Sequence, residues 1–234
     1  MSATPFSLMG PIDSLIRAGG LSGAEFAGTT QQMLEQFSVD QSLSDLCDFI
    51  LSDDQFLESI ATRSIRHPMG FDKIVLGQGA DGTLVKLDVW WEQDADWGTI
   101  HNHRFDFSSL VLAGELQTRL YFPSAKGEEY RFHSISIPSA DRDEEWHASR
   151  LALGWLESMP VNGRYTIDSG TFHTASSPLG TITATLVAQS APRRSFSLAS
   201  DGQPLEPLKR ISADELSARL RRLKALGARE LMSN

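Results

Sequence analysis

Two histidines separated by a single residue are the feature of this sequence best suited to chemistry. In Thr99-Ile100-His101-Asn102-His103 the two imidazoles stand at positions i and i+2. In an extended chain those positions point to the same face, so both rings can bind one metal ion. A surface pair, or a histidine hydrogen-bonded to a nearby carboxylate, would look the same in sequence. The interpretation as a metal site therefore depends on further ligands.

Four other histidines are candidates for a third ligand. His173 follows Gly170 by three residues, where a turn leads into a strand-like run, and His147 follows an acidic run. Both stay open on the residues alone. His67, which precedes a proline, and His133, in a strand-like run, are expected to have structural roles.

Strand-like runs fill the middle of the chain and would have to position these rings. Residues 83–91 alternate, with Val85, Leu87, Val89 and Trp91 on one face. Further runs lie at residues 74–76, 107–112, 116–122, 130–137, 151–156, 164–167 and 181–187. Asn162-Gly163 favours a hairpin turn, because both residues tolerate positive φ. Many short strands with turns between them predict an all-β sandwich or barrel.

Helical patterns flank this β region. They occur at residues 23–37, after Asp40 or Ser42, and around Phe56, and a last helix starts near Ser212 with Glu215 completing a capping box and ends near residue 230. We therefore divide the chain into three parts. The first is an N-terminal helical segment, residues 1–68, that packs on the barrel. The barrel itself spans residues 69–200, and a C-terminal loop and helix span residues 201–234.

Composition narrows the class of protein. The 234 residues carry a formal net charge of −9, which repels phosphate backbones and argues against nucleic-acid binding. No apolar run reaches the ~20 residues that span a bilayer, and no export signal is visible, so we expect a cytoplasmic protein without membrane contact. Cys47 is the only cysteine, so a metal site would have to use histidines and carboxylates.

The motifs together resemble the cupin superfamily, over about residues 70–190. The resemblance rests on the HxH of His101 and His103, on Gly114 eleven residues after His103, and on the turn from Gly170 to His173. It implies a mainly β fold, a single cupin barrel (a double-stranded β-helix, or jelly roll) with N-terminal helices and a C-terminal helix. It also implies that His173, rather than His147, is the third ligand, and a ring at a strand entry is better fixed than one in a polar insertion.

One departure from the cupin pattern defines the expected site. The acidic ligand of the first motif is missing, because its slot falls on Phe107 or Ser108 and Asp106 lies one residue too early. What remains is a three-histidine set, which resembles cysteine dioxygenase and related thiol dioxygenases. Asp106 is then a candidate to orient a ligand imidazole from behind.

The resemblance implies a mononuclear non-haem Fe(II)-dependent oxygenase, of dioxygenase type, that oxidises a small amino-acid-like or acidic metabolite with O₂. The substrate would bind the metal directly, since replacing a carboxylate ligand by histidine raises the charge of the site by one unit. Zn, Ni, Mn and Cu stay open as metals. A non-redox metal-dependent cupin (isomerase, lyase or hydrolase) and a non-catalytic metabolite-binding cupin are the alternative functions.

Substrate-binding residues are sought among cationic and phenolic side chains near the predicted strands. Arg119 and Tyr121 lie in the run after Gly114, and Arg119 could hold a carboxylate through two parallel hydrogen bonds. Arg104 and Tyr165 are further candidates, and a solvent-facing position is the alternative for each. Because cupins often pair through their sheets, a homodimer is one expected assembly.

Overall fold

The computed structural model describes residues 8–40, 42–92, 97–136, 146–200 and 208–230. Within these ranges the helices are α1 (Met9–Ala18), α2 (Gly23–Asp40), α3 (Leu43–Leu51), α4 (Asp54–Ala61) and α5 (Ala213–Glu230). The strands are β1 (Ile65–Arg66), β2 (Asp72–Gln78), β3 (Leu84–Trp90), β4 (Phe107–Ala113), β5 (Glu115–Ser136), β6 (Trp146–Pro160), β7 (Arg164–Ile167), β8 (Phe172–Ser176), β9 (Thr183–Gln189), β10 (Phe196–Ser200) and β11 (Lys209–Arg210). No described helix is both long and apolar enough to cross a membrane.

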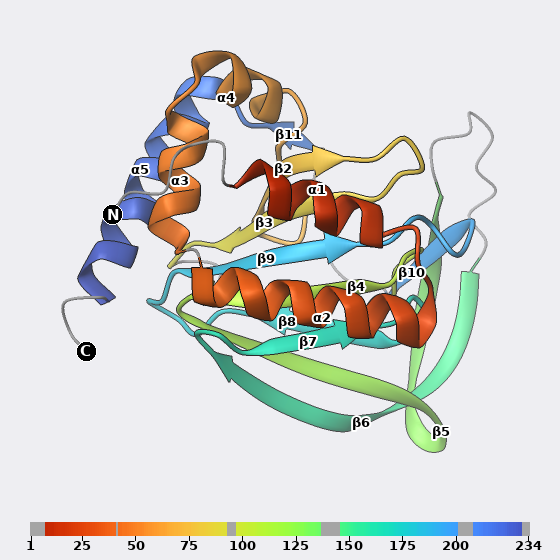
Figure 1. The fold of residues 1–234 in the computed structure, drawn as a ribbon. Coiled ribbons are helices and arrows are strands. Elements are labelled where there is room, and N and C mark those ends of the chain that lie inside the picture. The colour runs from red at the N-terminus through yellow and green to blue at the C-terminus, as the bar shows by residue number, and fades with distance from the viewer. Residues whose placement is uncertain (1–7, 41, 93–96, 137–145, 201–207, 231–234) are drawn as a thin grey trace.

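Two antiparallel sheets make up the β part of the molecule. The larger sheet has the strand order β11-β1-β2-β3-β9-β4-β7, and the smaller has the order β10-β5-β6 with β8 paired to β5. Figure 1 shows the long, curved β5–β6 ribbon below the larger sheet. The predicted fold class, a mainly β fold of antiparallel sheets with N-terminal helices and a C-terminal helix, is confirmed.

Local sequence signals explain where three of the described helices, α3, α4 and α5, begin. Ser42 and Asp45 form a reciprocal capping box at the start of α3, and the Asp53 carboxylate accepts a hydrogen bond from the Phe56 backbone N–H at the start of α4. The predicted capping box of Ser212 and Glu215 is present at α5. Each cap satisfies backbone donors that the first helical turn leaves unpaired.

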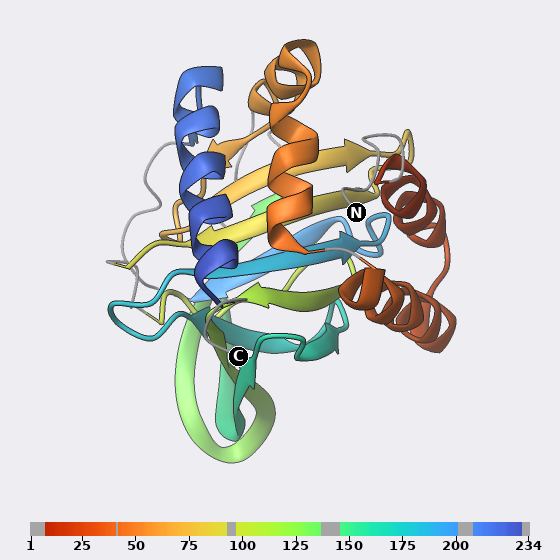
Figure 2. The same cartoon turned by 60° about the vertical axis from the view of Figure 1, so that its left-hand side comes forward.

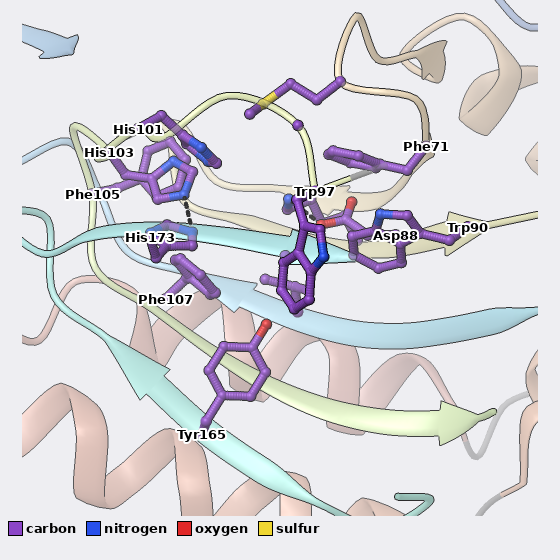
Figure 3. Close-up of a pocket in the computed structure, with 15 residues that line it drawn as sticks. Phe71, Asp88, Trp90, Trp97, His101, His103, Phe105, Phe107, Tyr165 and His173 are labelled. Carbon is purple, nitrogen blue, oxygen red and sulfur yellow. Dashed lines mark hydrogen bonds and ion pairs between the residues drawn. The ribbon is translucent and has the colours of Figure 1, made fainter. Parts of the chain in front are cut away.

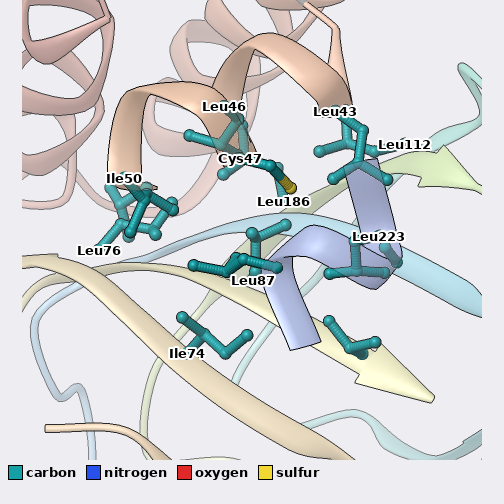
Figure 4. Packing of buried hydrophobic residues seen from close by; sticks show 14 of the residues in the cluster. Leu43, Leu46, Cys47, Ile50, Ile74, Leu76, Leu87, Leu112, Leu186 and Leu223 are labelled. Atoms are coloured by element: carbon teal, nitrogen blue, oxygen red, sulfur yellow. The ribbon is translucent and has the colours of Figure 1, made fainter. Parts of the chain in front are cut away.

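The main hydrophobic core lies between the larger sheet and the helices. The alternating face predicted for residues 83–91 points into it, with Val85, Leu87 and Val89 fully buried. Helices α3 and α5 supply the opposite layer, including Leu46, Cys47 and Leu223, as Figures 2 and 4 show. Each such aliphatic side chain contributes roughly 1.5–3 kcal/mol when taken out of water.

The other face of the larger sheet is buried as well, but by a different part of the molecule. All seven residues of β4 and all seven of β9 are buried, and six of the seven in β3. Because strand neighbours alternate, Lys86, Asp88 and Trp90 point away from the helices, toward the smaller sheet. The larger sheet is therefore a shared wall, with an apolar core on one side and a partly polar interior on the other.

Several connections differ from the sequence-based expectation. Asn162 does adopt a positive φ of 68°, but β6 pairs with β5 and β7 pairs with β4, so the turn carries the chain from one sheet to the other instead of closing a hairpin. The runs 116–122 and 130–137 belong to the single strand β5, and residue 137 lies outside the described ranges. The propensity of each run was visible in sequence, whereas its partner depends on the closure of the barrel.

Residues outside the predicted barrel also contribute strands. β1 pairs with both β2 and β11, so one segment from the predicted N-terminal helical region and one from the predicted C-terminal region extend the larger sheet. Each strand is two residues long, too short for a periodic pattern to be read. Residues 1–7, 201–207 and 231–234 of the predicted division lie outside the described ranges.

A buried carboxylate ties α5 to this sheet. Asp72 in β2 is fully buried, and its Oδ2 accepts hydrogen bonds of 2.6 Å from both the Arg219 guanidinium of α5 and the Trp91 indole. Its Oδ1 lies 3.4 Å from Arg66. By contrast, the ion pair between Lys224 of α5 and Asp48 of α3 is about half exposed on both sides.

We expect Asp72→Ala to lower the free energy of unfolding by about 2–3 kcal/mol, because charge-assisted hydrogen bonds in a buried site are lost. Asp48→Ala, which removes an exposed partner of the same helix, should cost under ~1 kcal/mol. Chemical denaturation of both variants measures the difference. Equal losses would contradict the role given to Asp72.

Candidate metal centre

The HxH segment is held in place by backbone pairing with two strands. The His101 N–H donates to the His173 carbonyl at 3.0 Å and the His173 N–H donates to the His101 carbonyl at 2.9 Å. On its other side His101 bridges to Ala199 of β10. Asn102, between the two histidines, is buried, and its amide oxygen accepts a hydrogen bond of 2.7 Å from the Leu198 N–H. The intervening residue thus anchors the segment that carries both rings.

Hydrogen bonds to backbone carbonyls orient two of the three imidazoles. His101 Nδ1 lies 2.9 Å from the Thr99 carbonyl oxygen, and His173 Nδ1 lies 3.3 Å from the Thr171 carbonyl oxygen. A carbonyl oxygen accepts only, so each Nδ1 carries the proton and each Nε2 presents a lone pair. This arrangement is typical of histidines that bind metals through Nε2.

The three rings converge on one point. Ligand atoms of His101, His103 and His173 all lie within 4.8 Å of one another, and Nε2 of His103 is 3.3 Å from Nε2 of His173. Two imidazole nitrogens bound to one ion at ~2.0–2.1 Å stand ~2.8–3.4 Å apart when their directions differ by roughly 90–110°. The observed separation fits a divalent ion between them. The donor set, three imidazoles, fits such an ion as well.

Burial keeps these imidazoles neutral. It lowers the pKa of His101 to about 4, while the pKa values of His103 and His173 lie well below their usual range, chiefly through desolvation and next through neighbouring histidines. The positive charge of Lys86 lowers the pKa of His101 and His103 further. Neutral imidazole is the form that binds metals, so the site needs little proton release before it can take up an ion.

A small cavity opens beside the three imidazoles (Figure 3). Its volume is about 60 Å³, enough for a few water molecules. Phe105 stacks on the His103 ring at a centroid distance of 4.9 Å, and Phe107 meets the same ring edge-on at 5.1 Å. The rest of the lining comes from Met69, Phe71, Lys86, Asp88, Trp90, Trp97, Gly98, Tyr165, Ala175 and Val187. The cavity is therefore mainly aromatic, with a few polar groups.

Of the four residues predicted to bind substrate, Tyr165 lines this cavity. Its hydroxyl points inward in Figure 3, and burial raises the pKa of Tyr165, so the phenol stays protonated. Arg119 and Tyr121 flank Leu120, which faces His173 across the β5–β8 ladder, so alternation directs both to the opposite face.

The surroundings of the other three differ from the expectation. The Arg119 guanidinium lies 3.7 Å from the centroid of the Trp97 ring, and Tyr121 packs in a cluster with Phe132. The Arg104 carbonyl accepts hydrogen bonds from the backbone N–H groups of residues 193 and 194. None of the three lines the cavity.

The Asp106 carboxylate contacts the backbone of the segment that carries His173. Its Oδ1 accepts a hydrogen bond of 2.8 Å from the Ser169 N–H, in the turn that leads to His173. Its Oδ2 lies 3.7 Å from Arg193 Nε, and its backbone N–H donates to Ser190 Oγ at 3.1 Å. Asp106 therefore connects the end of the HxH segment to the turn that presents the third imidazole.

His147 and His67 are not part of this group of ligand atoms. His147 Nε2 is 3.2 Å from Ser134 Oγ, and its ring stacks parallel to Phe196 at 6.0 Å. His67 stacks on Phe71 at 4.5 Å, and burial followed by the charge of Lys73 lowers its pKa to about 3. Among the described residues, the three-histidine group is the one set of ligand-type side chains close enough to share an ion.

Sequence reasoning missed Lys86 and Asp88 as cavity residues. In the alternating run 83–91 they occupy the face opposite to the apolar one, which in sequence is typical of a solvent-facing side. Their exposures are 8% and 6%. A signal was present only indirectly, because Trp90 shares this face and a large aromatic ring is seldom left in water.

This chain is similar to several solved structures. No family model and no curated protein matches the sequence. Solved structures with a similar fold include hydroxypropylphosphonic acid epoxidase from S. wedmorenis (14% identity, TM-score 0.31, 52% of this chain and 50% of that chain). KdgF from Halomonas sp. is also similar (15% identity, TM-score 0.31, 53% of this chain and 82% of that chain). So is the CENP-C cupin domain from Drosophila melanogaster (11% identity, TM-score 0.31, 52% of this chain and 70% of that chain). The chain spans about half the length of the epoxidase.

We expect His173→Ala to abolish stoichiometric metal binding, because two imidazoles remain and both come from one short segment. His147→Ala should leave metal binding close to that of the unaltered protein. Isothermal titration of the metal-free proteins with Co²⁺ or Zn²⁺, alongside thermal unfolding to verify folding, measures both. Loss of binding in the His147 variant with retention in the His173 variant would overturn the ligand assignment.

Asp106→Ala should weaken metal affinity by about 10–100-fold, as is usual when a group that positions ligands is removed. Asp106→Asn keeps an oxygen that can accept the Ser169 N–H, so it should retain most of the affinity. The same titrations compare the two variants. Unchanged affinity in Asp106→Ala would show that the turn before His173 is held without this carboxylate.

Proposed function

We propose that this protein is a mononuclear non-haem Fe(II)-dependent oxygenase, of dioxygenase type, that oxidises a small amino-acid-like or acidic metabolite with O₂. The observation that carries the proposal is the convergence of three neutral imidazoles beside a small cavity, with ligand atoms of the three within 4.8 Å of one another. A facial set of three protein ligands leaves positions open for other molecules. An enzyme that must bring a substrate and O₂ together needs such open positions.

The charge of the site supports iron chemistry on an anionic substrate. His101, His103 and His173 contribute no negative charge, so a divalent ion there keeps its full charge. Fe(II) held by these histidines would supply the redox partner for O₂. An acidic substrate that binds the metal directly would supply the negative charge that the ligand set lacks.

The residues around the ion would bind and orient the substrate and exclude water. The rings of Phe105 and Phe107 cover two sides of His103 and limit the entry of solvent. The Tyr165 hydroxyl, protonated and directed into the cavity, can donate a hydrogen bond to a bound oxygen atom. The volume of about 60 Å³ restricts the substrate to a small molecule.

The same ligand set is also compatible with a second class of function. Imidazole suits Zn, Ni and Cu as well as Fe, and metal availability decides much of the selectivity. A non-redox isomerase, lyase or hydrolase would use the ion to polarise a bound oxygen. The specific feature that favours this alternative is the buried Lys86–Asp88 pair in the same cavity, since such pairs can hold and release protons.

Protein expressed in iron-supplemented cells and purified without air should contain about one iron per chain. It should also consume O₂ when small acids or amino acids are added in an oxygen-electrode screen. His101→Ala should lose both properties, because one ligand is gone. Stoichiometric zinc or nickel with no O₂ uptake would favour the non-redox alternative, and failure to bind any metal after reconstitution would contradict both enzyme proposals.

A further inference from the structure

A buried ion pair faces the three histidines across the cavity. Lys86 and Asp88 lie two residues apart on β3, and Lys86 Nζ is 2.5 Å from Asp88 Oδ2. Both side chains line the cavity, and Figure 3 shows the imidazoles at one end and Asp88 toward the other. Removing two charges from water costs several kcal/mol per ion, so such a pair is weak evidence for a purely structural role.

Lys86 has more hydrogen-bond donors than the acceptors around it use. An ammonium group carries three N–H donors, and Asp88 Oδ2 is the one hydrogen-bond acceptor recorded for Lys86 among the described residues. A buried donor without a partner costs free energy, so the remaining N–H groups favour an acceptor inside the cavity. The Asp88 carboxylate holds the ammonium in place while leaving those donors available.

The surroundings of Lys86 carry excess positive charge. Lys73 of β2 is paired with Asp88 in the β2–β3 register, so its side chain is on the same face of the sheet. Burial, and next the charge of Lys86, lower the pKa of Lys73 to about 8. Asp88 balances Lys86, so a divalent ion between the histidines would leave the cavity positive, and Lys73 would add positive charge on the same face of the sheet.

The position of Lys86 relative to the histidines suits a substrate that touches both. The side chains of Lys86, His101 and His103 all line the same cavity. The cavity between them has room for only a small molecule. A ligand that binds the ion through one end would therefore present its other end to Lys86.

We propose that Lys86 binds a second anionic group of the substrate, and that the substrate is a small dicarboxylate whose other carboxylate binds the metal. This proposal rests on the proposed metal site. It narrows the substrate from an amino-acid-like or acidic metabolite to a dianion. An ammonium group at the second position would meet the like charge of Lys86, with the charge of Lys73 on the same face of the sheet, and the buried Asp88 Oδ1, which has no hydrogen-bond partner among the described residues, would be its acceptor.

Three probes of equal carbon number separate the candidate substrates: succinate, butyrate and 4-aminobutyrate. Full-length protein loaded with Co²⁺ is titrated calorimetrically with each, and malonate is added as a shorter dicarboxylate. We expect a dicarboxylate to bind at least about tenfold more tightly than butyrate, because the second carboxylate gains a charge-assisted hydrogen bond. 4-Aminobutyrate should bind no more tightly than butyrate.

Variants assign the preference to Lys86. In Lys86→Met the ratio of dicarboxylate to butyrate affinity should fall to about one. The double variant Lys86→Met/Asp88→Asn removes both charges, so it leaves no lone buried carboxylate to disturb folding, and it should lose the preference equally. Lys126→Met, which removes an exposed lysine on β5 outside the cavity, should keep it.

Titration with Co²⁺ distinguishes a failure of the role proposed for Lys86 from a failure of the proposed metal site. All three variants should still bind one Co²⁺, because the histidines are unchanged. Metal binding with an unaltered dicarboxylate preference in the double variant, or tighter binding of 4-aminobutyrate than of either dicarboxylate, would overturn the role of Lys86 alone. A protein that binds no Co²⁺ would overturn the proposed metal function, and the role of Lys86 with it.

Discussion

The pair of backbone hydrogen bonds between His101 and His173 is the interaction on which the candidate site depends. It joins two segments that are 72 positions apart in the sequence and belong to no common hairpin. Once these two backbones are in register, the side chain of His103, two positions on, reaches the same point as the other two. The Nδ1 hydrogen bonds to Thr99 and Thr171 then fix the ring orientations. The ligand geometry is thus a consequence of strand pairing and local carbonyls, and no carboxylate of the described residues is hydrogen-bonded to any of the three rings.

The second constraint is that the larger sheet is covered on both faces. Helices α1, α2, α3 and α5 cover one face of the larger sheet and form the main hydrophobic core with it. The other face therefore need not be apolar throughout. Polar residues can then stand inside the molecule on strands that are otherwise apolar. The Lys86–Asp88 pair occupies that inner face, directly behind which Leu87 packs into the helical core. One strand therefore serves stability and the cavity with alternate residues.

Much of this could be predicted from sequence, for identifiable reasons. The helices and most strands follow from periodicity and caps, and the HxH pair follows from alternation along an extended segment. Which strands pair could not be predicted at Asn162, because a turn that tolerates positive φ serves a hairpin and a crossing between sheets equally well. Lys86 and Asp88 were missed because alternation says which residues share a face, but not whether water or protein covers it. Arg119 and Tyr121 were candidates for the complementary reason: the sequence identified their strand, but it could not show which of its faces lines the cavity.

Cys47 allows local opening of this molecule to be measured by thiol labelling. It is the single thiol, fully buried between α3 and the sheet, and burial raises its pKa to about 12. The reactive thiolate is therefore almost absent in the native state, and an alkylating reagent gains access only when α3 detaches from the sheet. The rate of thiol labelling therefore reports how often the helical layer separates from the sheet. This measurement probes the helical face of the sheet, whereas the cavity lies on the other face of the same strands.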